Sequence, residues 1–568
     1  MSRRLTIALL VLNCVACAAI LGVRFSSNLR AGALYPTNGS ESLMAYSLWK
    51  VQHGFPLYEW PNRNSFSLTL YNWLFYYLYA SLLSGLRMSD ARLLVYGRIL
   101  TFCFCALGIA GSAALMLRSL PETLRKRALL LAIMTASLVW LSTSFLGWYV
   151  LTIRPDVIAV SIATFAMLAT LCAVDRDSSV WMILSALLYY ASWSMKQSAI
   201  ALLLGVCLFF LLSRRFRLLG VLIATFGTLV VFTLAIGGEV YRYNILAAPR
   251  VVASYSWHDA FSEWGKVIIL NLIVWILAAL AVVRLGARGW KNFLEAPVLA
   301  MMTCTLLAGV PLASLLLSKQ GAAKNHLLEV FVAAAALAFS ELAPAIIEPQ
   351  QNQLRYVVLL LALAWLAYPA AQLGYLIAFG SSSQGQGLRT GDFGLGSVSQ
   401  LKQGRTPWHV QLAFPEQLAQ RQKLASQLQS LPKPLYIRDE VLLLPWYATD
   451  DRYPAYNPDP IYESAAVSRG LMQPSLLQLL RQHHFASVVL ADNDSSQTEA
   501  LAAGYIALAP SSPLRVEGFH VFLYPTSRQQ ESRMQGLDRV RPISARPRPL
   551  LRPATTASSA ALSQRRPG

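Results

Sequence analysis

Ionisable residues stand at the borders of long apolar segments along the first 380 residues of the chain. Charged side chains are costly at the edge of a membrane, so they are candidates for function where they occur. Carboxylates grouped with several Lys and Arg suit a phosphate-bearing substrate, because the cations bind phosphate oxygens and a carboxylate can accept a hydroxyl proton. The candidates are Glu41, Arg154, Asp156, Lys196, Glu239, Arg242, Lys319, Lys324, His326 and Glu329.

Each candidate also has a plainer interpretation as an interfacial anchor whose charged end reaches the lipid headgroups. That interpretation is at least as good for three of them taken singly, namely Lys319, Glu239 and Arg242. It is weaker for the Arg154-Pro155-Asp156 run, because Asp156 opens an apolar segment and Pro155 suits the start of a helix. An ion pair or a helix cap formed by Arg154 and Asp156 explains this run about as well as catalysis does.

The segments that must position these residues are apolar. Of the 568 residues, 55% are hydrophobic and only 13% are charged, whereas ordinary soluble domains carry about 25% charged residues. Twelve segments are candidates to cross a hydrocarbon core of roughly 30 Å. They lie at about 5–23, 67–87, 97–117, 128–148, 157–174, 180–195, 198–213, 218–237, 266–284, 296–317, 326–347 and 355–379.

Basic residues between these segments indicate which of them cross, because cytoplasmic loops are enriched in Lys and Arg. Ser2-Arg3-Arg4 places the N-terminus inside. If segment 67–87 does not cross, the clusters at 118–127, 214–217 and 284–291 all become cytoplasmic. That segment is rich in Tyr and Trp, as an interfacial helix would be. The sequence therefore predicts eleven crossings with the C-terminus outside; the alternative is that 67–87 spans and a later segment does not.

The predicted fold class is an all-α polytopic membrane protein with a small C-terminal α/β domain. Strand-like runs at 435–437, 441–444, 486–490 and 521–523 alternate with helical stretches at 415–431 and 474–481. The predicted units are a membrane domain at 1–379 with a long first outer loop at 24–96, a flexible linker at 380–400, an extracytoplasmic α/β domain at 401–526, and a disordered Arg- and Pro-rich tail at 527–568.

Charge and cysteine content narrow the function further. The net charge of +20 comes from residues between apolar segments and in the last forty residues, not from one soluble face, so we do not expect nucleic acid as a partner. The seven cysteines all lie in apolar segments, which argues against a disulfide framework or a thiol metal site. No cofactor is predicted with certainty and no dedicated metal cluster is visible; a divalent ion shared by a carboxylate and a phosphate stays open.

Several motifs, in order, resemble the polytopic GT-C glycosyltransferases that use polyprenyl-phosphate sugars. The likeness is strongest to bacterial members related to aminoarabinose transferases and protein O-mannosyltransferases, and it covers most of residues 1–380. The motifs are Asn38-Gly39-Ser40-Glu41, His53-Gly54-Phe55-Pro56-Leu57-Tyr58, the aromatic segment 70–78, Gly97-Arg98-Ile99-Leu100, Ile153-Arg154-Pro155-Asp156-Val157, Met195-Lys196-Gln197 and the run 321–329 with Lys324, Asn325, His326 and Glu329.

This resemblance implies a bundle of 11 to 13 membrane helices with juxtamembrane helices in the first outer loop. It implies transfer of a sugar from a polyprenyl-phosphate carrier, usually with inversion, to a glycan, lipid or protein hydroxyl at the outer face of a bacterial inner membrane, among membrane lipids. The family's catalytic carboxylate lies in the first outer loop, often as Asp. In the corresponding stretch, Asn38-Gly39-Ser40-Glu41, this chain has only Glu41 and no Asp, so either Glu41 is the base with Asp156 assisting, or Asp156 is the base.

The same resemblance assigns the substrate-binding residues. They are Arg154, Lys196, Lys324, Asn325, His326 and Glu329. Two other classes remain as alternatives. A transporter or flippase of a lipid-linked substrate would show internal repeats and charges near the bilayer midplane, which the sequence does not show clearly. A non-catalytic membrane scaffold is kept open by the missing Asp. A pocket joining Glu41, Asp156, Lys196 and Lys324 would favour the enzyme.

Overall fold

The computed structural model describes most of the membrane region and parts of the C-terminal region. The described residues are 39–348, with gaps at 62, 64–66, 87–91, 143–148, 151, 252–254 and 320–323, then 426–437, 460–470, 475–491, 496–509 and 519–525, with a few single positions elsewhere. The predicted segments 5–23 and 355–379, the linker 380–400, the run 441–444, most of the helical stretch 415–431 and the tail 527–568 fall wholly or mainly outside them.

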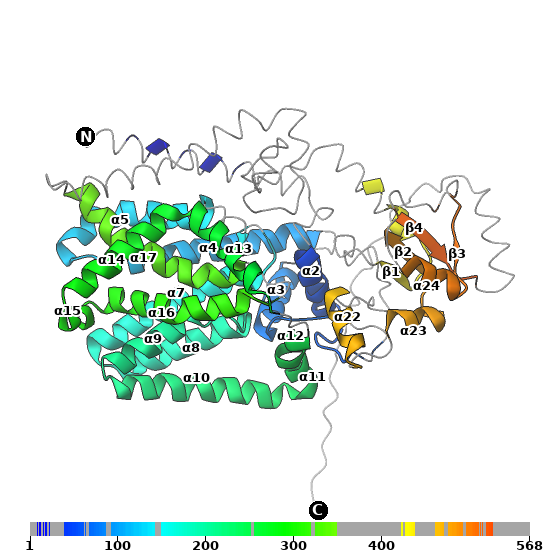
Figure 1. Cartoon of the computed structure of the whole chain (residues 1–568), viewed down its shortest axis with the longest axis horizontal. Coiled ribbons are helices and arrows are strands. Elements are labelled where there is room, and N and C mark those ends of the chain that lie inside the picture. Colours follow the sequence, from blue (N-terminus) through cyan, green and yellow to red (C-terminus); the bar gives the residue numbers. More distant parts are fainter. Residues whose placement is uncertain are drawn as a thin grey trace, which may run out of the picture.

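Long apolar helices run side by side and form the body of the molecule (Figure 1). In the described residues, five helices are long and apolar enough to cross a membrane, and a bent pair would make a sixth. These five are α4 (Leu93–Arg118), α7 (Pro155–Arg176), α10 (Phe216–Ile236), α16 (Pro297–Leu317) and α17 (Leu328–Ile347). Beside them run α5 (Glu122–Ser137), its π-helical continuation η3 (Leu138–Ser142), α8 (Ser179–Met195), α9 (Ala201–Leu212) and α14 (Leu272–Ala287). The chain is a multi-pass membrane protein, as predicted.

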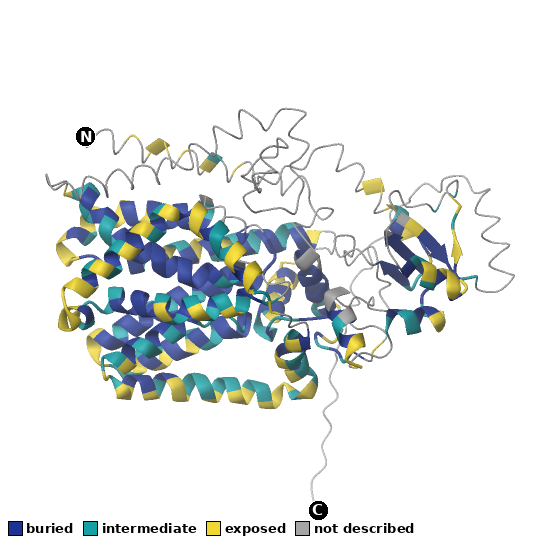
Figure 2. Ribbon diagram, in the orientation of Figure 1, coloured by how far each residue is buried: buried dark blue, intermediate teal, exposed yellow. Residues whose placement is uncertain are grey.

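Burial differs strongly between these helices (Figure 2). Helix α7 lies in the middle of the bundle, with 78% of its most apolar window buried, and packs against α8 and α4. Helix α10 is the opposite case, since only Leu218, Leu219 and Leu222 on it are buried. An apolar helix that exposes most of its surface is suited to lipid contact. Asp156 therefore begins one of the most enclosed helices of the protein.

Small residues bring the central helices close together. A Cβ atom on Gly205 of α9 would lie 2.1 Å from Oγ1 and 2.6 Å from Cα of Thr305 on α16. On α4, a Cβ atom at Gly111 would lie 2.1 Å from Oγ1 of Thr164 on α7. Membrane helices associate largely through such close backbone approach. Lipid tails are as apolar as the side chains, so there is no hydrophobic driving force for helices to pair.

The Gly205→Ala substitution is expected to destabilise the protein by about 1–3 kcal/mol, because the new methyl group would overlap the backbone of α16 and force the two helices apart. Thermal unfolding of the purified protein in detergent measures this as a lower melting temperature. Gly227→Ala on α10 is the matched control, since nothing lies within 4 Å of a Cβ atom there. Equal melting temperatures for the two variants would contradict the packing described.

The two ends of the bundle carry different residues. At one end, Arg118 pairs with Asp175 at 2.5 Å, Arg217 pairs with Asp177 at 2.7 Å, and Arg284 pairs with Glu341. These residues belong to or adjoin the basic clusters predicted to be cytoplasmic. The first residues of α7 and α17 and the last residues of α8 lie at the opposite end, next to α2 and α3 (Figure 1). The helices thus separate the basic clusters from the candidate site.

Two shorter helices of the first outer loop, α2 (Gly39–Gln52) and α3 (Trp73–Gly85), cover that opposite end. Helix α3 has 13 residues and is about 20 Å long, too short for a hydrocarbon core of roughly 30 Å. This agrees with the prediction that segment 67–87 does not cross. Its aromatic side chains are not all turned outward, however: Phe75, Tyr76 and Tyr79 are buried, and α3 packs against α2, α4 and α8.

The predicted segment 266–284 is wrong at its start. Helix α13 (Trp257–Leu270) ends within it, and α14 begins at Leu272 at an angle of 89°. Asn271 separates the two helices and donates from Nδ2 to the carbonyl of Val267. Between the predicted segments 218–237 and 266–284, the chain forms further helical turns: α11 (Gly238–Arg242), η4 (Tyr243–Ala247) and α12 (Ala248–Val251). Glu239 and Arg242 both lie on α11.

The C-terminal region contains the predicted small α/β structure. Its strands are β1 (Leu435–Ile437), β2 (Ser487–Ala491), β3 (Ile506–Ala507) and β4 (Phe519–Leu523), in the order β1-β2-β4-β3. Strand β1 is parallel to β2, and the other pairs are antiparallel. The helices are α22 (Pro460–Ser468), α23 (Leu476–Arg481) and α24 (Ser496–Ala502). Tyr462 of α22 shares a hydrogen bond with Tyr243 of η4, which ties this unit to the segment that follows α10.

Candidate functional site

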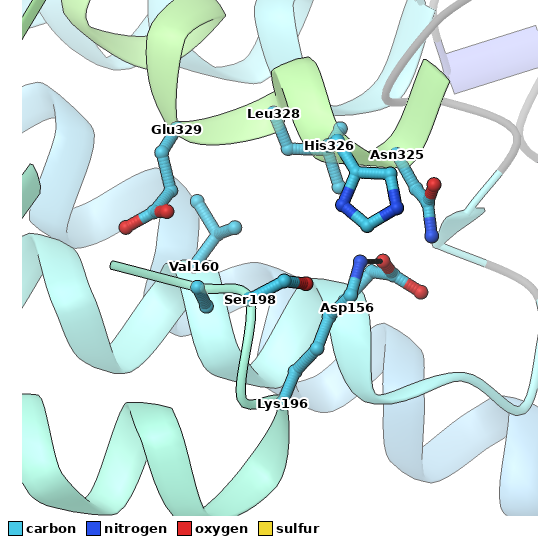
Figure 3. Close-up of a pocket in the computed structure, with 9 residues that line it drawn as sticks. Asp156, Val160, Lys196, Ser198, Asn325, His326, Leu328 and Glu329 are labelled. Atoms are coloured by element: carbon cyan, nitrogen blue, oxygen red, sulfur yellow. Dashed lines mark hydrogen bonds and ion pairs between the residues drawn. The ribbon is translucent and has the colours of Figure 1, made fainter. Parts of the chain in front are cut away.

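A small pocket lies where α7, the turn after α8, and the start of α17 meet (Figure 3). Its empty volume is about 230 Å³, counting the part open to solvent. Helix α7 contributes Asp156 and Val160, the α8–α9 turn contributes Lys196, Ser198 and Ala199, and the segment of the 3₁₀ helix η5 (Lys324–Leu327) and α17 contributes Asn325, His326, Leu328 and Glu329. Five of the predicted site residues therefore surround one pocket.

Asp156 is fully buried and paired through both carboxylate oxygens. Its Oδ1 accepts a hydrogen bond from Nζ of Lys196, and its Oδ2 accepts one from Nε of Arg154 at 3.2 Å. Arg154 is the extended residue before α7, and Pro155 opens the helix as the sequence predicts. Lys196 is the extended residue that ends α8. Arg154 and Asp156 form the ion pair that the sequence suggested as one interpretation. Lys196 is a second cation paired with the same carboxylate.

One buried carboxylate thus faces two cations, and Glu329 supplies a second carboxylate at the pocket. Arg154 is also held by two tyrosines: its Nη2 donates to the hydroxyl of Tyr71 at 3.4 Å, and its guanidinium lies 5.2 Å from the ring centroid of Tyr149. Sequence reasoning missed both tyrosines. Tyr71 stands in the predicted aromatic segment, but nothing in the pattern distinguishes it from its neighbours. An anion bound beside Asp156 would meet two cations, Arg154 and Lys196, that can make charge-assisted hydrogen bonds.

Two polar atoms around the pocket have no hydrogen-bond partner in the described part of the chain. They are Oδ1 of Asn325 and Nδ1 of His326, and both are buried. Leaving such a group unsatisfied costs about 1–3 kcal/mol, so native proteins rarely do so without a ligand, water or function. In Figure 3 the imidazole of His326 lies across the pocket from Asp156 and Lys196. A bound polar ligand would have partners on both sides of this space.

Glu329 has a different use in the fold. Its Oε2 accepts a hydrogen bond from the backbone N–H of Ala201 at 2.9 Å, and its Oε1 accepts one from Leu202 at 3.3 Å. These N–H groups belong to the first turn of α9, where no intrahelical acceptor exists. Glu329 therefore caps α9 from another helix, although it also lines the pocket.

Glu41 lies on α2 and does not line this pocket. It is fully buried, and its Oε1 accepts hydrogen bonds at 2.8 Å from both Nε of Arg98 and the backbone N–H of Ile153. Its Oε2 accepts a further bond from Nη2 of Arg98 at 2.6 Å. The assignment of Glu41 as base stays a prediction, but the carboxylate would first have to leave this pairing. For Lys324, the backbone opens η5, while its side chain lies outside the described residues.

A second buried ion pair in the first outer loop was not predicted. Nζ of Lys50 donates to Glu59 at 2.6 Å and to Oγ of Ser67 at 2.9 Å. Burial lowers the pKa of the Lys50 ammonium, an effect that the Glu59 carboxylate opposes. This pair fastens α2 to the loop that follows it. Lys50 and Glu59 stand nine positions apart, a spacing that by itself gives no signal that they are buried together.

Potential metal ligands do not gather into a cluster in the part of the chain that the structure describes. Within it, no group of three or more His, Cys, Asp or Glu side chains is arranged to hold a metal ion. Phosphate oxygens could complete a smaller set of ligands once a substrate is bound. The expectation of a shared divalent ion therefore stays a prediction.

No protein-family model matches the chain, and no curated protein matches it either. Two solved structures resemble it over 90% of its length and 97% of theirs, each at 15% sequence identity. They are crystal structures of ArnT from Cupriavidus metallidurans, in the apo state with a TM-score of 0.55 and bound to undecaprenyl phosphate with a TM-score of 0.53. At this identity the likeness shows the fold, and it confirms the predicted GT-C architecture.

Proposed function

We propose that this protein is a membrane glycosyltransferase that moves a sugar from a polyprenyl-phosphate carrier to a hydroxyl acceptor. The fold supports this, because one of the two similar ArnT structures holds undecaprenyl phosphate. The observation that carries the proposal is the pairing of buried Asp156 with both Arg154 and Lys196 at one end of the bundle. The fold alone would fit other activities, whereas this cluster supplies the charge that a lipid phosphate requires.

The carrier phosphate would bind between Lys196 and Arg154. Both side chains are almost fully buried, and in a water-poor site their charges act more strongly on an anion than they would in bulk water. The phosphate leaves the sugar as an anion, so it needs positive charge rather than a proton. The polyprenyl chain would extend from this end of the bundle into the apolar surroundings of the helices.

Asp156 is the residue that we assign as proton acceptor. In the free protein its oxygens are engaged by Lys196 and Arg154, and a phosphate that competes for these cations would free an oxygen. The acceptor hydroxyl then attacks the anomeric carbon and its proton passes to Asp156. The bond between that carbon and the phosphate oxygen breaks, and the electron pair leaves with the polyprenyl phosphate. A single displacement of this kind inverts the anomeric configuration.

The positive-inside rule supports an outer-face location for this chemistry, because the clusters around Arg118, Arg217 and Arg284 lie at the other end of the bundle. In that orientation the C-terminal α/β unit, proposed to cover residues 401–526, is extracytoplasmic and sits beside the outer loops. We propose that it shapes access for the acceptor, which would be an envelope glycan, a lipid or a protein. Grouping of the charges at one end also favours a transferase over a transporter.

Proteoliposomes that contain the purified protein and lipid extract from cells lacking it test this proposal. A transferase releases free polyprenyl phosphate from the sugar-linked carrier and attaches the sugar to an acceptor, both measurable by mass spectrometry. We expect this release only when the protein is present. Movement of intact sugar-linked carrier across the bilayer, with no release of polyprenyl phosphate, would instead identify a flippase.

A further inference from the structure

We propose that Glu41 and Arg98 form a positioning device for the anion site and that Glu41 does not take the proton in the reaction. This inference rests on the proposed function, because it concerns how the same site is held. Glu41 is in the first turn of α2 and Arg98 is on α4, 57 positions later. Both side chains are almost completely buried. Their paired contacts at 2.8 and 2.6 Å are the two-point geometry that makes an arginine–carboxylate pair strong.

The pair reaches the site through one backbone group. Oε1 of Glu41 accepts the N–H of Ile153 at 2.8 Å, and Ile153 directly precedes Arg154. Arg154 is the extended N-cap residue of α7, so its own N–H has no acceptor within that helix. The bond from Glu41 therefore fixes the backbone at the point from which the Arg154 side chain departs toward Asp156.

The side chain of Ile153 is fixed from the same direction. A Cβ atom on Gly97 would lie 2.5 Å from Cδ1 of Ile153, so only glycine lets α4 approach so closely. Gly97 is the residue before Arg98, and Ile153 is fully buried. Helix α2 thus holds the N–H of Ile153, and helix α4 packs against its side chain. These two contacts set where Arg154 and Asp156 lie relative to Lys196.

This arrangement makes Glu41 a poor proton acceptor. Each of its oxygens accepts a charge-assisted hydrogen bond from Arg98. Asp156 is also paired through both oxygens, but Asp156 and Lys196 line the pocket, where a bound phosphate can compete for the ammonium. Neither Glu41 nor Arg98 lines it. A proton on Glu41 would break the pair and leave the Arg98 charge buried without its counter-ion, which is strongly destabilising. The carboxylate is therefore expected to keep its charge throughout the reaction and to act on the site through the N–H of Ile153.

Two double variants separate positioning from proton transfer, and both remove the two charges together so that no buried charge is stranded. Glu41→Gln with Arg98→Met keeps a side-chain oxygen for the N–H of Ile153. Glu41→Ala with Arg98→Met removes that acceptor. The assay is the binding of undecaprenyl phosphate by the purified full-length protein, together with the transfer rate as a function of pH and the melting temperature.

We expect the Gln–Met variant to bind undecaprenyl phosphate within about threefold of the wild type and to keep the same pH profile of transfer. The Ala–Met variant should melt at a lower temperature than the Gln–Met variant, because the buried N–H of Ile153 loses its acceptor. It should bind undecaprenyl phosphate about tenfold more weakly, which corresponds to about 1.4 kcal/mol. If Glu41 and Arg98 served only to stabilise the fold, both variants would melt at lower temperatures and would bind undecaprenyl phosphate with the same affinity.

Two results would overturn the inference. In one, the Gln–Met variant binds undecaprenyl phosphate normally but loses transfer by about 100-fold or more, as expected if Glu41 is the base. In the other, the Ala–Met variant binds as well as the wild type. A wild-type protein that binds no undecaprenyl phosphate is a separate outcome, which would overturn the proposed function itself and this inference with it.

Discussion

Asp156→Asn is expected to reduce sugar transfer by at least about 100-fold, and to lower the melting temperature because two buried cations lose their counter-ion. The amide can accept hydrogen bonds from Lys196 and Arg154 but cannot take up the proton of the acceptor hydroxyl, and a positioned general base typically contributes about 10²- to 10⁴-fold. The expected effect is large because one substitution removes the base and also the negative charge that organises two buried cations. The measurement is release of polyprenyl phosphate in proteoliposomes at equal protein amounts.

Asp175→Asn provides the matched control for this prediction. Asp175 lies at the other end of the same helix, pairs with Arg118 at 2.5 Å and has a side chain that is 43% exposed. Exposed ion pairs contribute little to stability, typically up to about 1 kcal/mol, so transfer by this variant should stay near the wild-type rate. Similar losses in both variants would point to general damage to α7 and would contradict a specific role for Asp156.

Lys196→Met is expected to weaken the binding of undecaprenyl phosphate by between about 10-fold and about 100-fold. A hydrogen bond to a charged group is worth roughly 1.5–3 kcal/mol, and each step of about 1.4 kcal/mol changes the Kd tenfold. Loss of the ammonium also leaves Arg154 as the single described cation paired with Asp156, so the carboxylate repels the phosphate more strongly. Titration of the purified protein with undecaprenyl phosphate gives the Kd directly.

The matched control for this prediction is Lys266→Met on α13. Lys266 pairs with Glu263 and is 43% exposed, and it does not line the pocket. Its replacement should leave the Kd unchanged. If Lys196→Met also leaves the Kd unchanged in a protein of normal melting temperature, then the phosphate binds elsewhere and the proposed site is wrong.

The sequence predicts the membrane fold well because a lipid bilayer allows only a few kinds of secondary structure to cross it. Without water in the bilayer core, backbone groups must be satisfied internally, so long apolar runs become helices. Pro155 and Pro297 both mark the first residues of long helices, as proline does where a free N–H is not needed. Hydropathy missed the break at Asn271 within the predicted segment 266–284, because Leu270 and Leu272 stand on both sides of it.

The candidate site is predictable only in part. Asp156 and Lys196 were expected on one face because each borders an apolar segment at the same end, and α7 and α8 bring them together. The partners of Glu41 and Glu329 were not predictable, since these carboxylates bind groups 57 to 128 positions away. Such contacts depend on how helices pack, which periodicity and charge spacing do not encode.

The central claim is that the protein transfers a sugar through the pocket around Asp156. Mass spectrometry of envelope glycans, glycolipids and glycoproteins from a strain lacking the protein tests it most directly, because the missing product is detected whichever sugar and acceptor it contains. We predict a product that is lighter by one sugar residue, restored by the wild-type gene and by Asp175→Asn but not by Asp156→Asn. Unchanged glycans in the deletion strain, or full restoration by Asp156→Asn, would contradict the account.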